Sequence, residues 1–214
     1  MKLITKEIES KYGKKILFNE KLANYSWFNI GGPSEVFFKP TNIEDIIFFL
    51  KKVKPKKISI IGAGSNTLIR DGGVKGITIK LSSHFSYLNL TSLNIIEVGA
   101  ATLDKKIANF ALENSLTGLE FLSCIPGSIG GALRTNSGCY GQDISQILHS
   151  IKVIDINGNK KDILASEINF YYRGSNLDQN LIIISVKLQG IPSLKEKIKN
   201  KQQTLIEKKK NLNQ

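Results

Sequence analysis

The spacing of apolar side chains predicts a chain that mixes helices with strands. Apolar residues recur every three or four positions in Ile43–Val53 and again from Leu103 to Asn114, which is the period of a helix with one buried face. Leu3–Tyr12 reads as a shorter helix that stops at Gly13, and Thr41–Glu44 reads as a capping box in front of the first long helix. Short apolar runs predict strands at Glu35–Lys39, Lys56–Ile61, Ile77–Leu81, Ser86–Leu90, Asn94–Ala100 and Leu181–Leu188.

One further segment, Ile151–Leu164, reads as a β-hairpin. Its residues alternate on both sides of Asn157-Gly158, a dipeptide that supplies the two positive φ angles of a type I′ turn. The predicted strands and helices do not alternate as regular βαβ units. We therefore expect an α+β fold rather than a doubly wound parallel sheet.

Composition places the chain among soluble globular proteins. Its 214 residues suffice for one large domain or two modest ones, and 41% hydrophobic with 22% charged residues supports a sizeable core. No apolar run approaches the roughly 20 residues of a membrane helix, and the N-terminus lacks the apolar stretch of a secretory signal. Cys124 and Cys139 lack metal-type spacing. We expect a cytoplasmic protein with no metal site and no membrane partner.

The formal net charge of +12 does not by itself indicate a nucleic-acid partner. The cations are 27 lysines and three arginines, which resembles a bias of the whole sequence rather than a basic patch. Seven lysines cluster in Lys195–Lys210, where a predicted polar helix would expose them to solvent. Aromatic residues for base stacking and arginine forks for base edges are missing there. We therefore expect no nucleic-acid partner.

Two glycine-rich segments carry the candidate chemistry, and the first is Ile61–Leu68. It follows a predicted strand, but Thr67 stands where a dinucleotide fingerprint needs its third glycine, and no Gly-Lys-Ser/Thr of a P-loop follows. A glycine turn that ends in Ser65, Asn66 and Thr67 can present consecutive backbone N–H groups to an anion. An ordinary polar turn between strands is the alternative that this spacing leaves open.

The second segment is Ile125–Leu133, with the sequence IPGSIGGAL. A helix that begins near Ser128 would leave its first amides unpaired and ready for an anion, and Gly130 and Gly131 would let a flat ligand lie against the backbone. Two such loops in one chain favour a ligand with a pyrophosphate and a planar ring, such as a nucleotide or a flavin.

The three arginines all fall in or beside polar motifs. They are Arg70, Arg134 and Arg173, in a chain that otherwise uses lysine. Only arginine offers a planar fork that grips a carboxylate or phosphate with two hydrogen bonds. Arg173, within Phe170–Ser175, is the strongest candidate for a functional residue, whereas a surface ion pair would account equally well for Arg70.

Four ordered motifs resemble the UDP-N-acetylenolpyruvoylglucosamine reductases. The resemblance covers nearly the whole chain, apart from Asn29, where the family often has a basic residue, and Tyr171, where glycine is common. The motifs are WFNIGGPSEVFFKP (Trp27–Pro40), IGAGSNTLIRDGGVKGITIKL (Ile61–Leu81), GLEFLSCIPGSIGGALRTNSGCYG (Gly118–Gly141) and INFYYRGS (Ile168–Ser175).

The resemblance implies an FAD-binding fold of the vanillyl-alcohol-oxidase (PCMH) type, built from two α+β subdomains at residues 1–82 and 83–190. A lysine-rich terminal helix at 191–214 would follow. FAD would bind non-covalently, because His84 and His149 lie outside the matching loops. The cofactor residues would be Gly62, Ala63, Gly64, Ser65, Asn66 and Thr67 at the pyrophosphate, Ile125, Pro126, Gly127, Ser128, Gly130 and Gly131 at the ribityl chain and ring edge, and Ile183.

The activity implied is that of an NADPH-dependent flavin oxidoreductase. Its substrate would be UDP-N-acetylglucosamine enolpyruvate and its product UDP-N-acetylmuramate, a peptidoglycan precursor needed for cell-wall biogenesis, cell shape and division. Tyr172 and Arg173 would contact the substrate. Arg173 would be catalytic, because it matches the arginine that polarises the enolpyruvyl carboxylate and stabilises developing charge.

The family's proton-donating serine or cysteine and its catalytic glutamate lie in a C-terminal domain for which we find no matching motif here. Three interpretations remain open: a truncated reductase, a degenerate gene product, or half of a split enzyme completed by a separate chain. We expect the 214-residue chain to bind FAD weakly, to have little reductase activity, and to end in a helix without a docking partner. A flavin-binding module with no reductase role is the alternative function.

Overall fold

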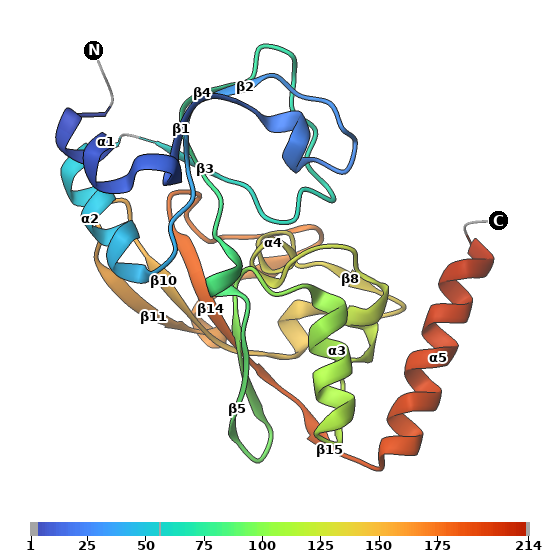
Figure 1. The fold of residues 1–214 in the computed structure, drawn as a ribbon. Coiled ribbons are helices and arrows are strands. Elements are labelled where there is room, and N and C mark those ends of the chain that lie inside the picture. Colours follow the sequence, from blue (N-terminus) through green and yellow to red (C-terminus); the bar gives the residue numbers. More distant parts are fainter. Residues whose placement is uncertain (1–3, 56, 213–214) are drawn as a thin grey trace.

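A four-stranded sheet forms the N-terminal lobe of the computed structural model, which describes residues 4–55 and 57–212 (Figure 1). Parts of predicted elements that fall on residues 1–3, 56 and 213–214 lie outside this description. The strand order is β1-β2-β4-β3, antiparallel for β1–β2 and parallel for the other two pairs. The elements of this lobe are α1 (Lys6–Tyr12), β1 (Ile16–Lys21), β2 (Pro33–Phe38), α2 (Ile43–Val53), β3 (Ile58–Ile60) and β4 (Val74–Ile79).

A five-stranded antiparallel sheet, in the order β11-β10-β14-β6-β5, forms the second lobe. Helices α3 and α4 pack with it, and α5 runs beside α3 (Figure 1). The main elements are β5 (Leu88–Ser92), β6 (Ile95–Gly99), α3 (Asp104–Glu113), α4 (Ile129–Arg134), β10 (Leu148–Ile154), β11 (Lys160–Leu164), β14 (Ile182–Gln189) and α5 (Lys195–Leu212).

Short strands and 3₁₀ turns complete the chain. Three two-stranded pairs are formed by β7 (Leu116–Thr117) with β15 (Ile191–Pro192), β8 (Gly138–Cys139) with β9 (Gln142–Asp143), and β12 (Phe170–Tyr171) with β13 (Gly174–Ser175). The 3₁₀ turns are η1 (Gly13–Lys15), η2 (Leu22–Tyr25), η3 (Ser83–Phe85), η4 (Glu120–Cys124), η5 (Ile144–Gln146) and η6 (Ala165–Glu167). The predicted mixture of helices and strands is confirmed.

The apolar core has two large clusters that are joined through the second sheet. In the N-terminal cluster α2 packs on the sheet, and Phe38 stacks on Phe49 with ring centroids 4.1 Å apart. Ile154, Ile182 and Ile184 come from β10 and β14 but belong to this same cluster. The second cluster is built around β6, α3, α4, β10 and β14. The two lobes are therefore held together through the C-terminal end of β10 and the N-terminal end of β14.

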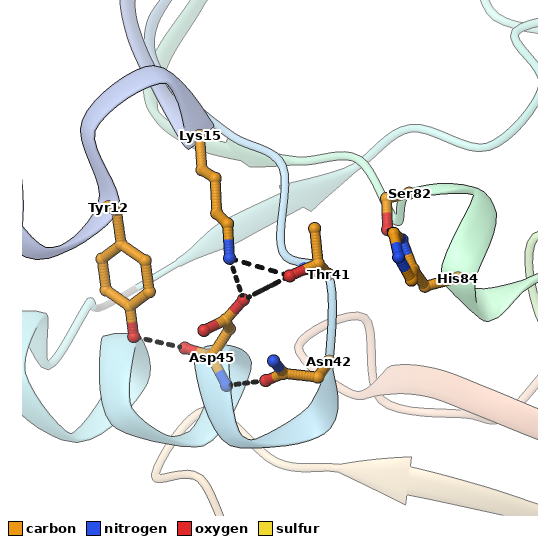
Figure 2. Close-up of polar contacts among 7 residues, drawn as sticks. All are labelled: Tyr12, Lys15, Thr41, Asn42, Asp45, Ser82 and His84. Carbon is orange, nitrogen blue, oxygen red and sulfur yellow. Dashed lines mark hydrogen bonds and ion pairs between the residues drawn. The ribbon is translucent and has the colours of Figure 1, made fainter.

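Helix α2 begins one residue later than the predicted capping box. Asn42 is the N-cap, and its Oδ1 accepts the N–H of Asp45 at 2.7 Å. Thr41 donates its hydroxyl to Asp45 Oδ2 at 3.0 Å, and Lys15 pairs with the same oxygen at 2.9 Å (Figure 2). The predicted Thr41–Glu44 capping box is therefore wrong. Asn42 caps the helix, and the Thr41 hydroxyl binds the Asp45 carboxylate together with Lys15. Figure 2 also shows Ser82 beside His84, with Oγ and Nδ1 3.4 Å apart.

The hairpin between β10 and β11 is confirmed, but its turn is not type I′. Gly158 has a φ of +84°, whereas Asn157 is not among the residues with positive φ. The Asp155 N–H donates to the Asn159 carbonyl at 2.9 Å, which closes a loop of three residues. Asp155 Oδ1 also accepts the N–H groups of Asn157 and Asn159. The Asp155 side chain thus determines the geometry of the loop, which differs from the type I′ turn that the Asn-Gly dipeptide predicts.

The lysine-rich terminal helix α5 is docked, contrary to expectation. Ile198 and Leu205 are buried, and Gln202 Nε2 donates to Asn109 of α3 at 2.9 Å. Lys201 pairs with Glu120 of η4 at 3.0 Å. Most of the remaining lysines are exposed, as predicted. Within residues 4–55 and 57–212, no helix combines the length and apolarity needed to cross a bilayer.

Candidate functional site

The two glycine-rich loops meet, although some sixty positions separate them. Ser65 Oγ donates to the Pro126 carbonyl at 2.8 Å. A Cβ on Gly62 would lie 2.8 Å from Ser128 Oγ, so the first turn of one loop rests on the beginning of α4 in the other. The residues that the sequence assigns to one cofactor therefore form one continuous surface.

Glycine is required at specific points of this surface. Gly64 has a φ of +73°, and a Cβ there would stand 1.9 Å from the Tyr25 carbonyl oxygen. The loop is fixed from the same side by two hydrogen bonds, from the Trp27 N–H to the Gly64 carbonyl at 3.0 Å and from Ser26 Oγ to the Thr67 carbonyl at 3.1 Å. The conformation of the first loop is thus set by the neighbouring 25–27 segment.

The backbone amides of the first loop are available to a ligand. Among the residues that the structure describes, none accepts a hydrogen bond from the N–H groups of Gly62 through Asn66. Successive N–H groups of this kind form an anion-binding concavity. This part of the predicted site is consistent with a phosphate ligand.

The amides at the beginning of α4 are paired, and the predicted anion site there is wrong. Ile129 N–H donates to the Thr102 carbonyl and Gly130 N–H to the Ala100 carbonyl, each at 3.0 Å. These carbonyls belong to the segment after β6, which the local sequence could not place opposite the helix. What α4 does offer is the bare backbone at Gly131, where a Cβ would meet no atom within 4 Å outside the helix's own backbone. Contact between a flat ligand and this open face stays a prediction.

A cavity of about 680 Å³ lies beside the contact between the loops. It is bordered by β3 and the loop after it, by the segments that follow β4 and β6, by α4, and by β14. Six predicted cofactor residues line it: Gly62, Ala63, Ser128, Gly130, Gly131 and Ile183. The other seven, namely Gly64, Ser65, Asn66, Thr67, Ile125, Pro126 and Gly127, lie in the same two loops outside this lining.

Lys80 is a lining residue that the sequence analysis missed. Its Nζ donates to the Gly62 carbonyl, which ties the end of β4 to the loop that follows β3. Burial, with the nearby positive charge of Lys39, lowers the pKa of Lys80. Lys80 lies near the end of a predicted strand, and the residues after two parallel neighbouring strands meet at one edge of the sheet. Had the parallel pairing of β3 and β4 been predicted, Lys80 could have been placed beside Gly62.

Arg134 also lines the cavity, but its guanidinium is occupied by the protein itself. It donates to the carbonyls of Leu177, Asp178 and Leu181, the last through Nη2. Burial lowers the pKa of Arg134. The side chain therefore holds the 177–181 segment at the cavity wall. Its guanidinium binds three backbone carbonyl oxygens instead of the carboxylate or phosphate of a ligand.

Arg173 and Tyr172 lie outside the cavity lining. They form the tip between β12 and β13, where Tyr172 is 89% exposed and the Arg173 guanidinium lies 5.6 Å from the Tyr172 ring centroid. Arg173 has a φ of +62°, an uncommon conformation for a non-glycine residue. Asn136, just beyond α4, donates to the Tyr171 carbonyl at 3.5 Å, so the tip is attached to the α4 side of the site.

The two cysteines lie on the same side as Arg173. The pKa of Cys139 is raised to about 11, mainly by burial and by the neighbouring Cys124 thiol, with smaller opposing effects from the charges of Lys209 and Arg173. Cys139 is therefore a poor nucleophile at neutral pH. Within residues 4–55 and 57–212, no group of three or more His, Cys, Asp or Glu side chains is arranged to hold a metal ion.

Comparison with known proteins identifies relatives among the UDP-N-acetylenolpyruvoylglucosamine reductases. A family model described as an FAD binding domain matches residues 34–163. The UDP-N-acetylenolpyruvoylglucosamine reductase of Pelagibacter ubique (strain HTCC1062) is 44% identical over 205 residues, which cover 95% of this chain and 68% of that protein. The enzyme of the same name from Orientia tsutsugamushi (strain Ikeda) is 42% identical, over 84% of this chain and 62% of its own length.

A solved structure shows the same architecture. The crystal structure of the Thermus caldophilus UDP-N-acetylenolpyruvylglucosamine reductase matches with a TM-score of 0.78 and 26% identity, over 91% of this chain and 68% of that one. The chain thus spans between 62% and 68% of the length of these three relatives. The expected α+β FAD-binding fold is confirmed.

Proposed function

Because this chain belongs to the UDP-N-acetylenolpyruvoylglucosamine reductase family and carries its FAD-binding domain, we propose that it binds FAD non-covalently where its two glycine loops meet. The reaction that we propose is the NADPH-dependent reduction of UDP-N-acetylglucosamine enolpyruvate to UDP-N-acetylmuramate. It would take place in the cytoplasm and supply peptidoglycan synthesis, and through it cell shape and division.

One observation supports this proposal most directly. The unpaired amides of Gly62–Asn66 and the bare backbone of Gly131 border the same loop contact, beside a cavity of about 680 Å³. A diphosphate needs the first feature, a flat ring system needs the second, and the volume falls within the range of cofactor pockets. The residues present therefore fit FAD.

We assign the binding roles accordingly. The N–H groups of the 62–67 loop would hold the diphosphate, and the Lys80 ammonium, which already bonds the Gly62 carbonyl, would offset its charge. Ser128 and Gly131 would border the ribityl chain and ring. Residues 1–82 and 83–190 would act as the two FAD-binding subdomains. When bound, FAD supplies the hydride-transfer chemistry of the reaction.

The tip that carries Tyr172 and Arg173 would meet the substrate. The Arg173 fork suits a carboxylate, and fixed positive charge there would stabilise the negative charge that develops on the enolpyruvyl group. Arg173 is exposed and lies outside the cavity lining. In this scheme the cofactor fills the cavity, so the substrate would bind outside it, where an exposed Arg173 side chain can reach it.

A test of cofactor binding compares two glycine variants. Gly131→Leu puts a side chain on the open α4 face, whereas Gly72→Leu puts one at another position where a Cβ meets nothing within 4 Å, outside the cavity lining. We expect Gly131→Leu to weaken FAD binding at least tenfold in a fluorescence titration, and Gly72→Leu to retain the wild-type affinity. Wild-type protein that binds no FAD, or equal losses in both variants, would refute the assignment.

A second function, a flavin-binding module without reductase activity, is favoured by one fact, namely that Arg173 does not line the cavity. Arg173→Lys separates the two. For a module and for a reductase alike, Arg173→Lys should leave FAD binding intact. Only a reductase oxidises NADPH when the enolpyruvyl substrate is present, and the substitution should abolish that activity. Substrate-dependent oxidation of NADPH by the wild-type protein would exclude the module.

A further inference from the structure

Asp104, the first residue of α3, has a buried carboxyl group without a partner among the residues that the structure describes. The residue is 0% exposed, and neither Oδ1 nor Oδ2 accepts or donates a hydrogen bond within the part of the chain that the structure describes. A buried carboxyl without a partner is costly, so its presence beside the proposed ligand site calls for a role. The proposed function assigns it none.

This carboxyl lies directly under the contact between the two cofactor loops. The Asp104 N–H donates to the Gly127 carbonyl at 3.1 Å. A Cβ on Gly127 would stand 3.4 Å from Asp104 Oδ2 and 3.2 Å from Ser65 Oγ. Since Ser65 also donates to Pro126, one small space is bounded by α3 and by both loops. A change in the charge or hydration of Asp104 is therefore felt by both loops at once.

The ionisable groups around Asp104 do not neutralise it. On its own helix Lys105 and Lys106 are exposed, and neither forms an ion pair with it. In the loops, the segments Gly62–Thr67 and Ile125–Ser128 contain no ionisable side chain, while Arg70 and Asp71 farther along are exposed.

The groups on η4 and α5 are engaged elsewhere. Glu120 pairs with Lys201, and Lys209 donates to the Cys124 carbonyl, which leaves the Cys124 thiol as the only other ionisable group of η4. Burial raises the pKa of Asp104 to about 8, so at neutral pH the group is largely the uncharged acid.

We propose that Asp104 is a positioning residue of the cofactor site: its uncharged acid supports the contact between the loops, and its ionisation weakens binding of an anionic diphosphate cofactor. The inference rests on the proposed function. An ionised Asp104 would place a negative charge beneath the amides that hold the diphosphate, in a region from which water is largely excluded. It would also have to recruit water or a donor, which separates Ser65 from the Gly127 turn.

The test measures FAD affinity from pH 6.5 to 9.5 by quenching of flavin fluorescence. We expect the Kd of the wild type to be constant near neutrality and to rise at least tenfold as the pH passes through the titration of Asp104. Asp104→Asn, an uncharged group of the same shape, should bind as the wild type does at pH 6.5 and show no such rise. Asp71→Asn removes an exposed carboxyl from the neighbouring segment and should keep the wild-type profile.

The comparison with Asp104→Asn also removes the effect of other ionisable groups near the cofactor site. Lys80, whose pKa is lowered, is present in every variant, so its contribution appears in Asp104→Asn as well. A profile that is flat in the wild type, or identical in Asp104→Asn, overturns the proposal. Riboflavin, which lacks phosphate, is a second probe whose affinity should follow pH much less than that of FAD.

An infrared measurement separates this inference from the proposed function. The carbonyl stretch of a protonated carboxylic acid should be present in the wild-type protein at pH 7, absent from Asp104→Asn, and lost from the wild type above the titration. If the wild type binds no FAD at any pH, the proposed function fails and this inference with it. If FAD binds and the infrared band is missing, only the role of Asp104 is refuted.

Discussion

The attachment of α5 depends on Glu120. The structure lets us rank how much the free energy of unfolding falls when Glu120 or its partner Lys201 is replaced. Glu120 is 1% exposed and accepts hydrogen bonds from the Thr117 hydroxyl, from the Gly118 N–H at 2.9 Å and from Lys201 Nζ at 3.0 Å. Burial by itself would raise the pKa of this carboxyl, but the bonds from Thr117 and Lys201 outweigh it, and the pKa is lowered. The carboxylate is thus ionised and shared by two elements.

The two partners should differ in importance. Lys201→Met removes one donor that is 45% exposed and leaves Glu120 its bonds to Thr117 and Gly118, so we expect a loss of about 1 kcal/mol in the free energy of unfolding. Glu120→Ala removes the acceptor of all three donors and opens a cavity, so we expect a loss of roughly 3–5 kcal/mol. Urea denaturation at pH 7, followed by circular dichroism, measures both.

The pH dependence provides an independent check. Because the folded-state pKa of Glu120 lies below its ordinary value of 4.5, its stabilisation is complete above that value and is lost as the pH falls through the folded-state pKa. The difference between wild type and Lys201→Met should therefore shrink below about pH 4. Equal losses for the two variants at pH 7, or a difference that grows with acid, would refute this reasoning.

Three further predictions concern the loops and the thiols. Gly62→Ala should lower the melting temperature because its Cβ meets Ser128 Oγ at 2.8 Å, and adding Ser128→Gly should restore part of the loss; equal melting temperatures for the single and double variants would contradict this contact. Lys80→Met should weaken FAD binding about tenfold and flatten its dependence on salt, measured by fluorescence titration, whereas an unchanged salt dependence would place the cation away from the diphosphate. Cys139, with its pKa raised to about 11, should react with iodoacetamide at pH 8 at least tenfold more slowly than glutathione does, as followed by mass spectrometry; comparable rates would refute its assigned burial.

The sequence predicted those features that depend on short-range periodicity. Helix α2 and strands β4 and β6 follow from repeated apolar positions, and the family's motifs assigned both glycine loops, which the structure brings into contact, to one cofactor. The features that it missed depend on partners far along the chain. The α4 amides are paired because Thr102 and Ala100 lie opposite them.

Side chains that looked ordinary account for the other differences. Lys201 is one lysine among many in a polar helix, and only the fold shows that Glu120 faces it. Asp104 resembles the acidic first-turn residue of any helix, and its burial beneath Gly127 depends on a loop more than twenty positions later. In the same way, no local pattern indicates that the Arg134 fork is used on backbone carbonyls.

The central strand of the second sheet determines when the protein can become folded during its own synthesis. Ile95 of β6 pairs with Gln189 of β14, and at 5–20 residues per second the ribosome needs roughly 5–20 s to cover the 94 positions from 95 to 189. For that interval the β5–β6 hairpin has an unpaired edge, and its apolar Ile96 and Val98 lack their partners. The N-terminal lobe waits as well, since Ile182 and Ile184 complete its core. A nascent chain of this protein therefore exposes both glycine loops to the cell before either lobe is stable.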